Sequence, residues 1–496
     1  MDYDLHLTAR VPEGTSHISD RVVSLCLIAF AMCIAIFVAW QVALYVPQRF
    51  ERDYGEGFVW SEVEYFRAGR LYPPITDYPY TIMHYTPVYY SVVAALWALG
   101  LDPLLAGRIV SLASGAALVW GCGLLASGAM PSESPRRGKT VAGLAAATIA
   151  AGMPELIDWS TLMRVDMLAN CLGTMGLVAL QRRRRGEIWL YVAGACYLLA
   201  LMTKQNTVAP LIAGVTALAI VEHTTAIRFA GVVAAVGMVC VGVAEAATQG
   251  EFLHHTVLYN VARFDWSQLE AWVLLAGLSA MPLIVAFGFS TWKLRQIGKS
   301  AAWREDPAAW TAMALSIYLA VGLIMSLGIG KVGAGPNYML PLLVPAAALC
   351  GLALGEASRR WAPILLWVLA LGVAEGLVIC PFQSRADLVR RDRNDTALLG
   401  VVRSTPEPVF SEDMTLLMRA GRPVPWELGG FAELARLGIV DETPLVKRLQ
   451  DGWFDTLIVY NWSPQFFTDA VQAAARTRYQ RITKIDEFEV WRRKPQ

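Results

Sequence analysis

Long apolar runs recur along most of this chain, and they constrain its fold more than any other feature. They follow one another from residue 22 to residue 381, and several reach the roughly 20 residues that an α-helix needs to cross a bilayer. Of the 496 residues, 55% are hydrophobic and only 17% are charged, whereas an average soluble domain carries about 25% charged residues. The sequence therefore predicts a polytopic α-helical membrane protein.

Charge, the N-terminus and the cysteines narrow the class further. The formal net charge is +1 and the pI is about 7.6, which argues against a nucleic-acid partner. The first apolar run, Val22–Val46, is too long for a cleaved signal peptide and predicts a retained span. All 8 cysteines lie in apolar runs without a CxxC pair, so we expect neither a disulfide nor a cysteine metal site.

Basic turns predict the orientation of the spans, because Lys and Arg are enriched on the cytoplasmic side. Four such turns lie at residues 131–139, 181–187, 292–306 and 356–361. About eleven spans place all four turns inside, together with the N-terminus. These spans are expected at about 22–46, 104–130, 140–154, 166–181, 188–203, 207–222, 228–247, 270–291, 308–328, 339–355 and 362–381.

The first external loop, residues 47–103, is too long for a simple connector. Its segment 57–70 is amphipathic and predicts an interfacial helix, with Glu62 and Glu64 on the wet face. Segment 87–100 is apolar but short, and one more span here would invert every later loop. We therefore expect a second juxtamembrane helix at 87–100, on the outer face.

Charge density rises after residue 381, where no membrane-length run remains. The stretches EPVFSED and DTLIVYN predict buried strands, each followed by a helical segment, and a hairpin is expected over 479–492. Alternating strands and helices indicate a small α/β domain. We therefore divide the chain into a transmembrane domain, 1–381, and an extracytoplasmic domain, 382–496.

Charged groups at the outer ends of the spans are few, and an ionisable group near membrane depth is a functional candidate unless it is paired structurally. The motif DYGEG places Asp53 and Glu56 at the head of the first interfacial helix. In MRVDMLAN, Arg164 and Asp166 begin a later span. In both motifs the structural alternative is a helix cap, or an Arg–Asp pair in the second.

Two further motifs lie at outer span ends. In MTKQN, Lys204 ends one span, and snorkelling of its amine to the interface is the alternative explanation. In KVGAGPNYMLP, glycines permit close backbone approach beside Asn337 and Tyr338, the alternative being a loop of no special role. Together, two acids, an arginine and a lysine on one face match a site for an anionic lipid-linked substrate, in which carboxylates accept a proton and cations hold phosphate.

In order and content these motifs resemble the GT-C superfamily of membrane glycosyltransferases, in the group around protein O-mannosyltransferases and the aminoarabinose transferase of lipid A. The resemblance covers residues 30–400 in organisation. It rests on the acidic DYGEG motif, on GRLYPP and HYTP (84–87), on Arg164-Val165-Asp166, on Thr203-Lys204, and on the segment Gly333–Tyr338.

The resemblance implies a GT-C-like fold and transfer of a sugar from a polyprenyl-phosphate donor on the outer face. A first-loop acid would be the general base, and Asp166 would assist or bind the acceptor or a metal. Donor phosphate and substrate would contact Lys204 and, beside it, a set of polar and aromatic residues: Arg164, His84, Tyr85, Gln205, Asn337 and Tyr338.

One departure concerns the base. Many relatives have adjacent acids in the first loop, whereas this chain separates Asp53 from Glu56 by two residues. We favour Glu56, since it is nearer the helix start. A single carboxylate suffices for displacement with inversion. The sequence implies no particular cofactor, and a divalent metal is left open, with Glu56 and Asp166 as its ligands if one binds.

The partners expected are a polyprenyl-phosphate sugar, an acceptor that is a lipid, a glycan or a protein, and membrane lipids. A lipid or sugar transporter is the main alternative; it would place charged or broken helices at mid-membrane, often in repeated halves. No internal repeat is visible, and the charges gather at one face. The basic-loop bias suggests a bacterial inner membrane, with the site and the C-terminal domain on the periplasmic side.

Overall fold

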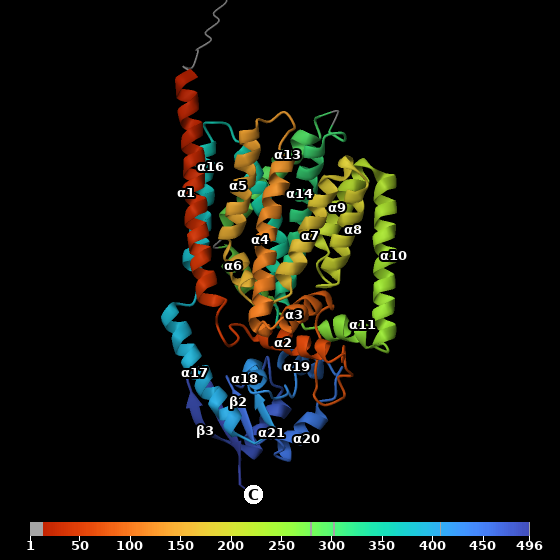
Figure 1. The fold of residues 1–496 in the computed structure, drawn as a ribbon, viewed down its shortest axis with the longest axis vertical. Helices are drawn as coiled ribbons and strands as arrows, with labels where there is room; N and C mark the ends of the chain where they lie inside the picture. Colours follow the sequence, from red (N-terminus) through yellow and green to blue (C-terminus); the bar gives the residue numbers. More distant parts are fainter. Residues whose placement is uncertain (1–12, 278–279, 301–302, 407, 496) are drawn as a thin grey trace, which may run out of the picture.

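The computed structural model describes residues 13–495, apart from 278–279, 301–302 and 407. A bundle of long helices forms one part of the molecule, and a small α/β domain covers one end of it (Figure 1). The N-terminal helix begins at the opposite end. The chain is thus a polytopic α-helical membrane protein with a C-terminal α/β domain, as the sequence predicts.

The bundle helices follow the order of the predicted spans. They are α1 (Glu13–Tyr45), α4 (Pro103–Ala129), α5 (Arg136–Gly152), α7 (Asp166–Gln181), α8 (Ile188–Leu201), α9 (Ala209–Val221), α10 (His223–Ala247), α12 (Trp266–Gly277), α13 (Ala280–Ile297), α14 (Pro307–Ser326), α15 (Leu340–Glu356) and α16 (Ala362–Ile379). The predicted span 270–291 includes residues 278–279, which lie outside the described residues. Within the described chain, 6 helices are long and apolar enough to cross a membrane, or 7 if the bent pair α5 and α6 (Pro154–Ser160) is one span. The predicted number of about eleven spans stays a prediction.

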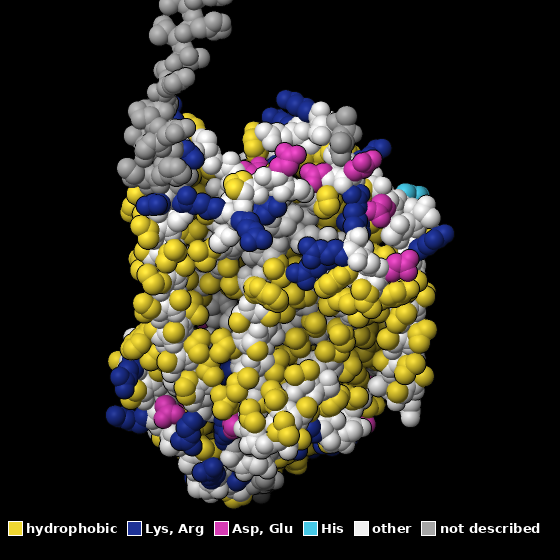
Figure 2. Space-filling model, turned by 45° about the horizontal axis from the view of Figure 1, so that its top comes forward, with side chains coloured by type: hydrophobic (Ala, Val, Ile, Leu, Met, Phe, Trp, Pro, Cys, Tyr) yellow, Lys and Arg dark blue, Asp and Glu magenta, His cyan; other side chains and the backbone are white. Residues whose placement is uncertain are grey.

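The bundle is organised around α15, which is buried along most of its length. Close packing in a membrane relies on small residues at helix contacts. At Gly351 an added side chain would overlap the Ala142 backbone of α5, so this contact requires glycine. On the face seen in Figure 2, a broad hydrophobic area covers the bundle, and charged side chains lie at both of its ends, many of the Lys and Arg side chains at the end where the N-terminal helix begins. The four basic turns lie at that end, opposite the C-terminal domain.

Short elements fill the space between the bundle and the C-terminal domain (Figure 1). They are α2 (Tyr54–Arg67), α3 (Val88–Ala98), α6, α11 (Glu251–Thr256), η2 (Leu258–Asn260), η3 (Leu327–Gly330) and η4 (Pro336–Met339); η1 (Arg183–Arg185) lies at the other end. Helices α2 and α3 occupy the stretches predicted as juxtamembrane helices. Glu64 is exposed, as expected, but the expectation of a wet Glu62 is wrong. Glu62 is buried because its carboxylate accepts hydrogen bonds from the His84 backbone N–H and the Tyr90 hydroxyl.

The C-terminal domain contains a four-stranded sheet in the order β1-β2-β4-β3. Its elements are α17 (Arg385–Ser404), β1 (Val409–Ser411), α18 (Met414–Arg419), α19 (Leu428–Arg436), α20 (Thr443–Gln450), β2 (Thr456–Val459), α21 (Asp469–Arg478), β3 (Tyr479–Ile485) and β4 (Phe488–Arg493). Strands β1 and β2 are parallel, and the other two pairs are antiparallel. The domain is docked on the first loop by a β-bridge between Tyr80 and Trp426 and by an ion pair between Arg419 and Asp102.

Candidate active site

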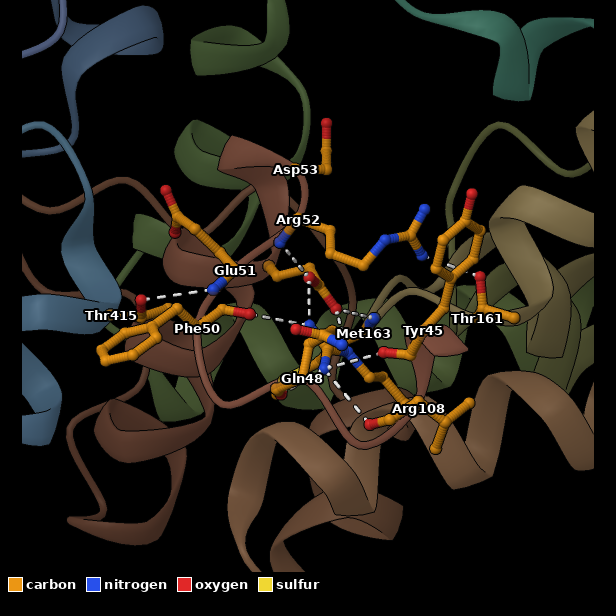
Figure 3. A network of polar contacts seen from close by, with 12 residues as sticks. Tyr45, Gln48, Phe50, Glu51, Arg52, Asp53, Arg108, Thr161, Met163 and Thr415 are labelled. Carbon is orange, nitrogen blue, oxygen red and sulfur yellow. Dashed lines mark hydrogen bonds and ion pairs between the residues drawn. The ribbon is translucent and has the colours of Figure 1, made fainter. Parts of the chain in front are cut away.

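An arginine in α4 organises the first loop beneath the bundle (Figure 3). The Arg108 side chain is fully buried and pairs in a bidentate manner with Glu56, Nε to Oε1 at 2.8 Å and Nη2 to Oε2 at 2.7 Å. Its remaining donors reach backbone carbonyls of the segment before α2, including those of Gln48 at 2.5 Å and Phe50 at 3.0 Å. Arg108 therefore fixes the path by which the chain leaves α1 and enters α2.

The carboxylate of Glu56 has no oxygen lone pair free to accept a proton, because hydrogen-bond donors occupy both of its oxygens. Besides the two Arg108 bonds, it accepts the backbone N–H groups of Arg52 at 2.8 Å and Met163 at 2.7 Å. Burial alone would raise the pKa of Glu56, but the charge and hydrogen bonds of Arg108 outweigh it and hold that pKa below its ordinary value. The prediction that Glu56 takes the acceptor proton does not fit this geometry, because the carboxylate is enclosed and fully paired.

Asp53 differs from Glu56 in both respects. It is the N-cap of α2, its Oδ1 accepts the Gly55 N–H at 3.0 Å, and its side chain is 39% exposed. Arg164 Nη1 donates to the same Oδ1 at 2.8 Å, so Oδ2 is left available. In Figure 3 the Asp53 side chain points away from Arg108. Burial raises the pKa of Asp53 above its ordinary value, although Arg164 opposes this.

A second carboxylate lies beyond Arg164. Asp166 is the first residue of α7 and is buried, and its Oδ1 accepts Lys204 Nζ at 2.5 Å and Asn337 Nδ2 at 2.8 Å. Arg164 Nε lies 3.9 Å from Asp166 Oδ2. The guanidinium thus bridges Asp53 and Asp166, and four charges of alternating sign run from the first loop to Lys204.

The ammonium of Lys204 faces a small pocket of about 20 Å³. The pocket is lined by Asp166, Asn170, Lys204, Asn206, Thr207, Met325, Asn337, Tyr338 and Pro341. Two rings flank the ammonium, with its Nζ 5.8 Å from the Tyr85 centroid and 5.6 Å from the Tyr338 centroid. Because Asp166 accepts from Nζ only once, two N–H donors of Lys204 remain for an anion. The arrangement suits a phosphate group with an apolar substituent.

His84 and Gln205 lie to one side of this line of charges. Gln205 Nε2 donates to the carbonyls of His84 and Thr256, so its amide holds the loop backbone. His84 Nε2 lies 3.7 Å from a carboxylate oxygen of Glu427 in the C-terminal domain. Burial lowers the pKa of His84, but the hydrogen bond and charge of Glu427 and the charge of Glu62 raise it overall. The HYTP segment thus contacts the C-terminal domain through His84 and the Lys204 region through Tyr85.

The structure therefore brings together a group from the predicted set: Asp53, Arg164, Asp166, Lys204, Tyr85, Asn337 and Tyr338. The side chains of Glu56, His84 and Gln205 lie nearby, but their hydrogen bonds and ion pairs are made to other partners. Sequence reasoning missed Arg108 and Glu427. A lone arginine inside the apolar run LLAGRIVSL is the signal that marks Arg108, since a charge in a span requires a partner. Nothing in WELGGF marks Glu427, whose partner Tyr54 lies far away in the sequence.

The two carboxylates named as possible metal ligands do not share an open site. Both oxygens of Glu56 accept hydrogen bonds from N–H donors. Of the oxygens of these two carboxylates, Oδ2 of Asp166 is the one without a hydrogen-bond partner. Among the residues that the structure describes, no group of three His, Cys, Asp or Glu side chains is arranged to hold a metal ion. The residues present therefore do not fit a metal bound by Glu56 and Asp166.

Comparison with known proteins gives the fold. No family model and no curated protein sequence matches the chain. Among solved structures, ArnT from Cupriavidus metallidurans in the apo state superposes with a TM-score of 0.61, 15% identity, and coverage of 95% of this chain and 99% of that chain. The chain has the GT-C fold.

Two further GT-C structures support this assignment. ArnT bound to undecaprenyl phosphate matches with a TM-score of 0.59 at 15% identity, covering 95% of this chain and 99% of that one. The Archaeoglobus fulgidus oligosaccharyltransferase in the apo form gives 0.52 at 11% identity, covering 86% of this chain and 69% of that one. ArnT, a lipid A aminoarabinose transferase, and the oligosaccharyltransferase are GT-C glycosyltransferases, so the predicted resemblance is confirmed for the fold.

Proposed function

We propose that this protein transfers a sugar from a polyprenyl-phosphate donor to an acceptor hydroxyl at the end of the bundle that carries the C-terminal domain. The observation that carries the proposal is the line of charges Asp53–Arg164–Asp166–Lys204, which ends in a pocket suited to phosphate. Support also comes from the fold, since an ArnT of the same architecture has been solved with undecaprenyl phosphate.

In the proposed reaction, Asp53 Oδ2 accepts the proton as the acceptor O–H bond breaks. The acceptor oxygen forms a bond to the anomeric carbon, and the bond from that carbon to the phosphate oxygen breaks. The electron pair leaves with the polyprenyl phosphate, whose charge Lys204 and Arg164 stabilise. Asp166 is a positioning residue that holds Lys204. A single displacement of this kind inverts the anomeric configuration.

Asp53 is proposed as the base in place of Glu56 because it keeps an exposed carboxylate oxygen, and its raised pKa favours proton acceptance. The site would lie on the periplasmic side of a bacterial inner membrane, since the basic turns at the other end follow the positive-inside rule. The acceptor would be a lipid, a glycan or a protein chain.

The test incubates the purified protein with labelled polyprenyl-phosphate sugars and candidate acceptors. Asp53→Asn is expected to lose turnover by on the order of 10²–10⁴-fold. Its fold is expected to remain, because Asn caps a helix as well as Asp does. Glu64→Gln is the matched control, since Glu64 is an exposed carboxylate of the same helix, and its activity should stay at the wild-type level.

Full activity of Asp53→Asn would refute the assignment of the base. A product that keeps the donor's anomeric configuration would rule out the single displacement. If no lipid-linked sugar is consumed, and the protein instead moves such a lipid from one leaflet of a vesicle membrane to the other, the protein is a transporter and not a transferase.

A further inference from the structure

A second and larger pocket, of about 450 Å³, lies where α17, the C-terminal sheet and the segment before α2 meet. Its lining is strongly acidic, with seven carboxylates against two guanidinium groups. Four of the carboxylates, Glu51, Asp395, Glu412 and Asp413, are buried; the others are Asp387, Asp486 and Glu487. The glycosyl-transfer proposal does not use this pocket.

Three of the four buried carboxylates, those of Glu51, Asp395 and Asp413, have one oxygen without a hydrogen-bond partner. Glu51 is 5% exposed, and its Oε2 is buried without a hydrogen-bond partner. Figure 3 shows its side chain directed away from Arg108. Asp413 is 1% exposed; its Oδ1 caps α18 through Thr415 and Leu416, whereas Oδ2 has no partner. Burying such groups unpaired is costly, so they indicate a missing ligand.

The two arginines of the pocket do not supply the missing charge. Arg390 pairs with Asp387 at 2.9 Å, and Arg391 lies 3.6 Å from Asp395. The charge of Arg391 lowers the pKa of Glu51 and of Asp413, but neither carboxylate forms a close ion pair with a described cation. Burial, reinforced by the nearby Asp413 charge, raises the pKa of Glu412 and of Asp395 to about 7. At pH 8 these two carboxylates are therefore ionised, and the pocket then carries more negative charge than its two arginines neutralise.

We propose that this pocket binds an organic cation with a primary ammonium or guanidinium group. The volume exceeds what a bare metal ion needs, and no group of three ligating side chains in the described chain is arranged for one. Four aromatic rings, Tyr54, Tyr460, Phe466 and Phe488, share the lining with the carboxylates. Rings beside carboxylates suit an alkylated cation, which gains cation–π and apolar contacts together with ion pairs.

The binding experiment needs no transferase activity, so its failure is distinguishable from failure of the proposed function. The purified full chain in nanodiscs is titrated by calorimetry at pH 8 with spermidine and with agmatine, and separately with MgCl₂ and CaCl₂. Saturable binding of spermidine or agmatine is expected, without comparable binding of either metal. Glu51→Gln and Asp413→Asn should each weaken binding about tenfold, because each removes a buried charge that the cation contacts.

Asp469→Asn is the matched control, because Asp469 is an exposed acid of α21 outside the pocket, and its affinity should equal that of the wild type. Asn at 413 keeps the cap of α18 through its side-chain oxygen, and Glu412→Gln provides a further variant if Glu51→Gln does not fold. Absence of saturable binding, preference for Mg²⁺ or Ca²⁺, or equal affinity of wild type and the folded pocket variants would each overturn the proposal.

Discussion

Replacing Glu56 by glutamine tests whether this carboxylate stabilises the fold or acts as the catalytic base. In the folded protein Glu56 is fully buried, makes two charge-assisted bonds to Arg108 and accepts two backbone N–H groups. Glutamine has the same shape, but it removes the charge and turns one acceptor into an NH₂ donor that faces other donors. Arg108 is then left as a buried cation without a counter-ion.

The expected cost is about 3–5 kcal/mol, which is the range for removing one partner of a buried ion pair. For a chain of this size, that corresponds to a fall in melting temperature on the order of 5 °C. Thermal unfolding of the purified variant, followed by the fluorescence of its tryptophans, measures the shift. Turnover measured well below the melting temperature should fall only modestly, because Asp53 remains in place.

Arg108→Met provides the second arm of a double-mutant cycle. The double variant Glu56→Gln/Arg108→Met should be less destabilised than the sum of the two single variants, with a coupling of about 2–3 kcal/mol for groups in direct contact. Recovery should be incomplete, since Arg108 also binds backbone carbonyls of Gln48 and Phe50. A Glu56→Gln protein with unchanged melting temperature and abolished turnover would refute this reasoning and restore Glu56 as the base.

Three other perturbations probe the neighbouring groups. Gly55→Ala should lower turnover at least tenfold with little change in melting temperature, measured side by side, because the new methyl group would overlap the Arg164 guanidinium; unchanged turnover would contradict the role of that residue. Lys204→Gln should weaken binding of undecaprenyl phosphate about tenfold or more in a filter assay, through loss of a charge-assisted bond, whereas Lys331→Gln should not. Burial raises the pKa of Glu62 from 4.5 to about 7, so the folded state binds this proton more tightly than the unfolded state does. Proton binding therefore stabilises the folded state by about 3 kcal/mol. This stabilisation is complete below pH 4.5 and is lost as the pH rises through 7. Melting temperatures between pH 5 and 8 should therefore fall less steeply in Glu62→Gln than in the wild type, and identical slopes would contradict this.

Hydropathy and turn chemistry predicted the architecture well, because each signal is local. The apolar runs correspond to bundle helices, and the hairpin over 479–492 appears as β3 and β4. The group of Arg164, Asp166 and Lys204 was also predictable, since costly charges at neighbouring span ends gain stability by pairing. These interactions depend on residue type and position along the chain, both of which the sequence displays.

Partners that come from distant segments were not predictable. The amphipathic pattern of 57–70 placed Glu62 in water, but the HYTP segment folds over it and supplies a backbone N–H, and α3 supplies the Tyr90 hydroxyl. Likewise, the choice between Asp53 and Glu56 depended on Arg108, which lies 52 residues beyond Glu56. Spacing within DYGEG gave no information about which acid that arginine would bind.

The four carboxylates of residues 53–64 differ in their contacts, although they lie within one short stretch of sequence. Each has a different environment: Asp53 contacts Arg164, Glu56 contacts Arg108, Glu62 binds the loop at His84, and Glu64 is exposed to solvent. A base must keep an accessible oxygen and also lie beside the cations that hold the leaving group. Glu56 and Glu62 fail the first condition because they are enclosed, and Glu64 has no contact with the line of charges. Asp53 meets both, because its position as the N-cap leaves its carboxylate outside the first turn of α2, where the adjoining Gly55 admits the Arg164 guanidinium.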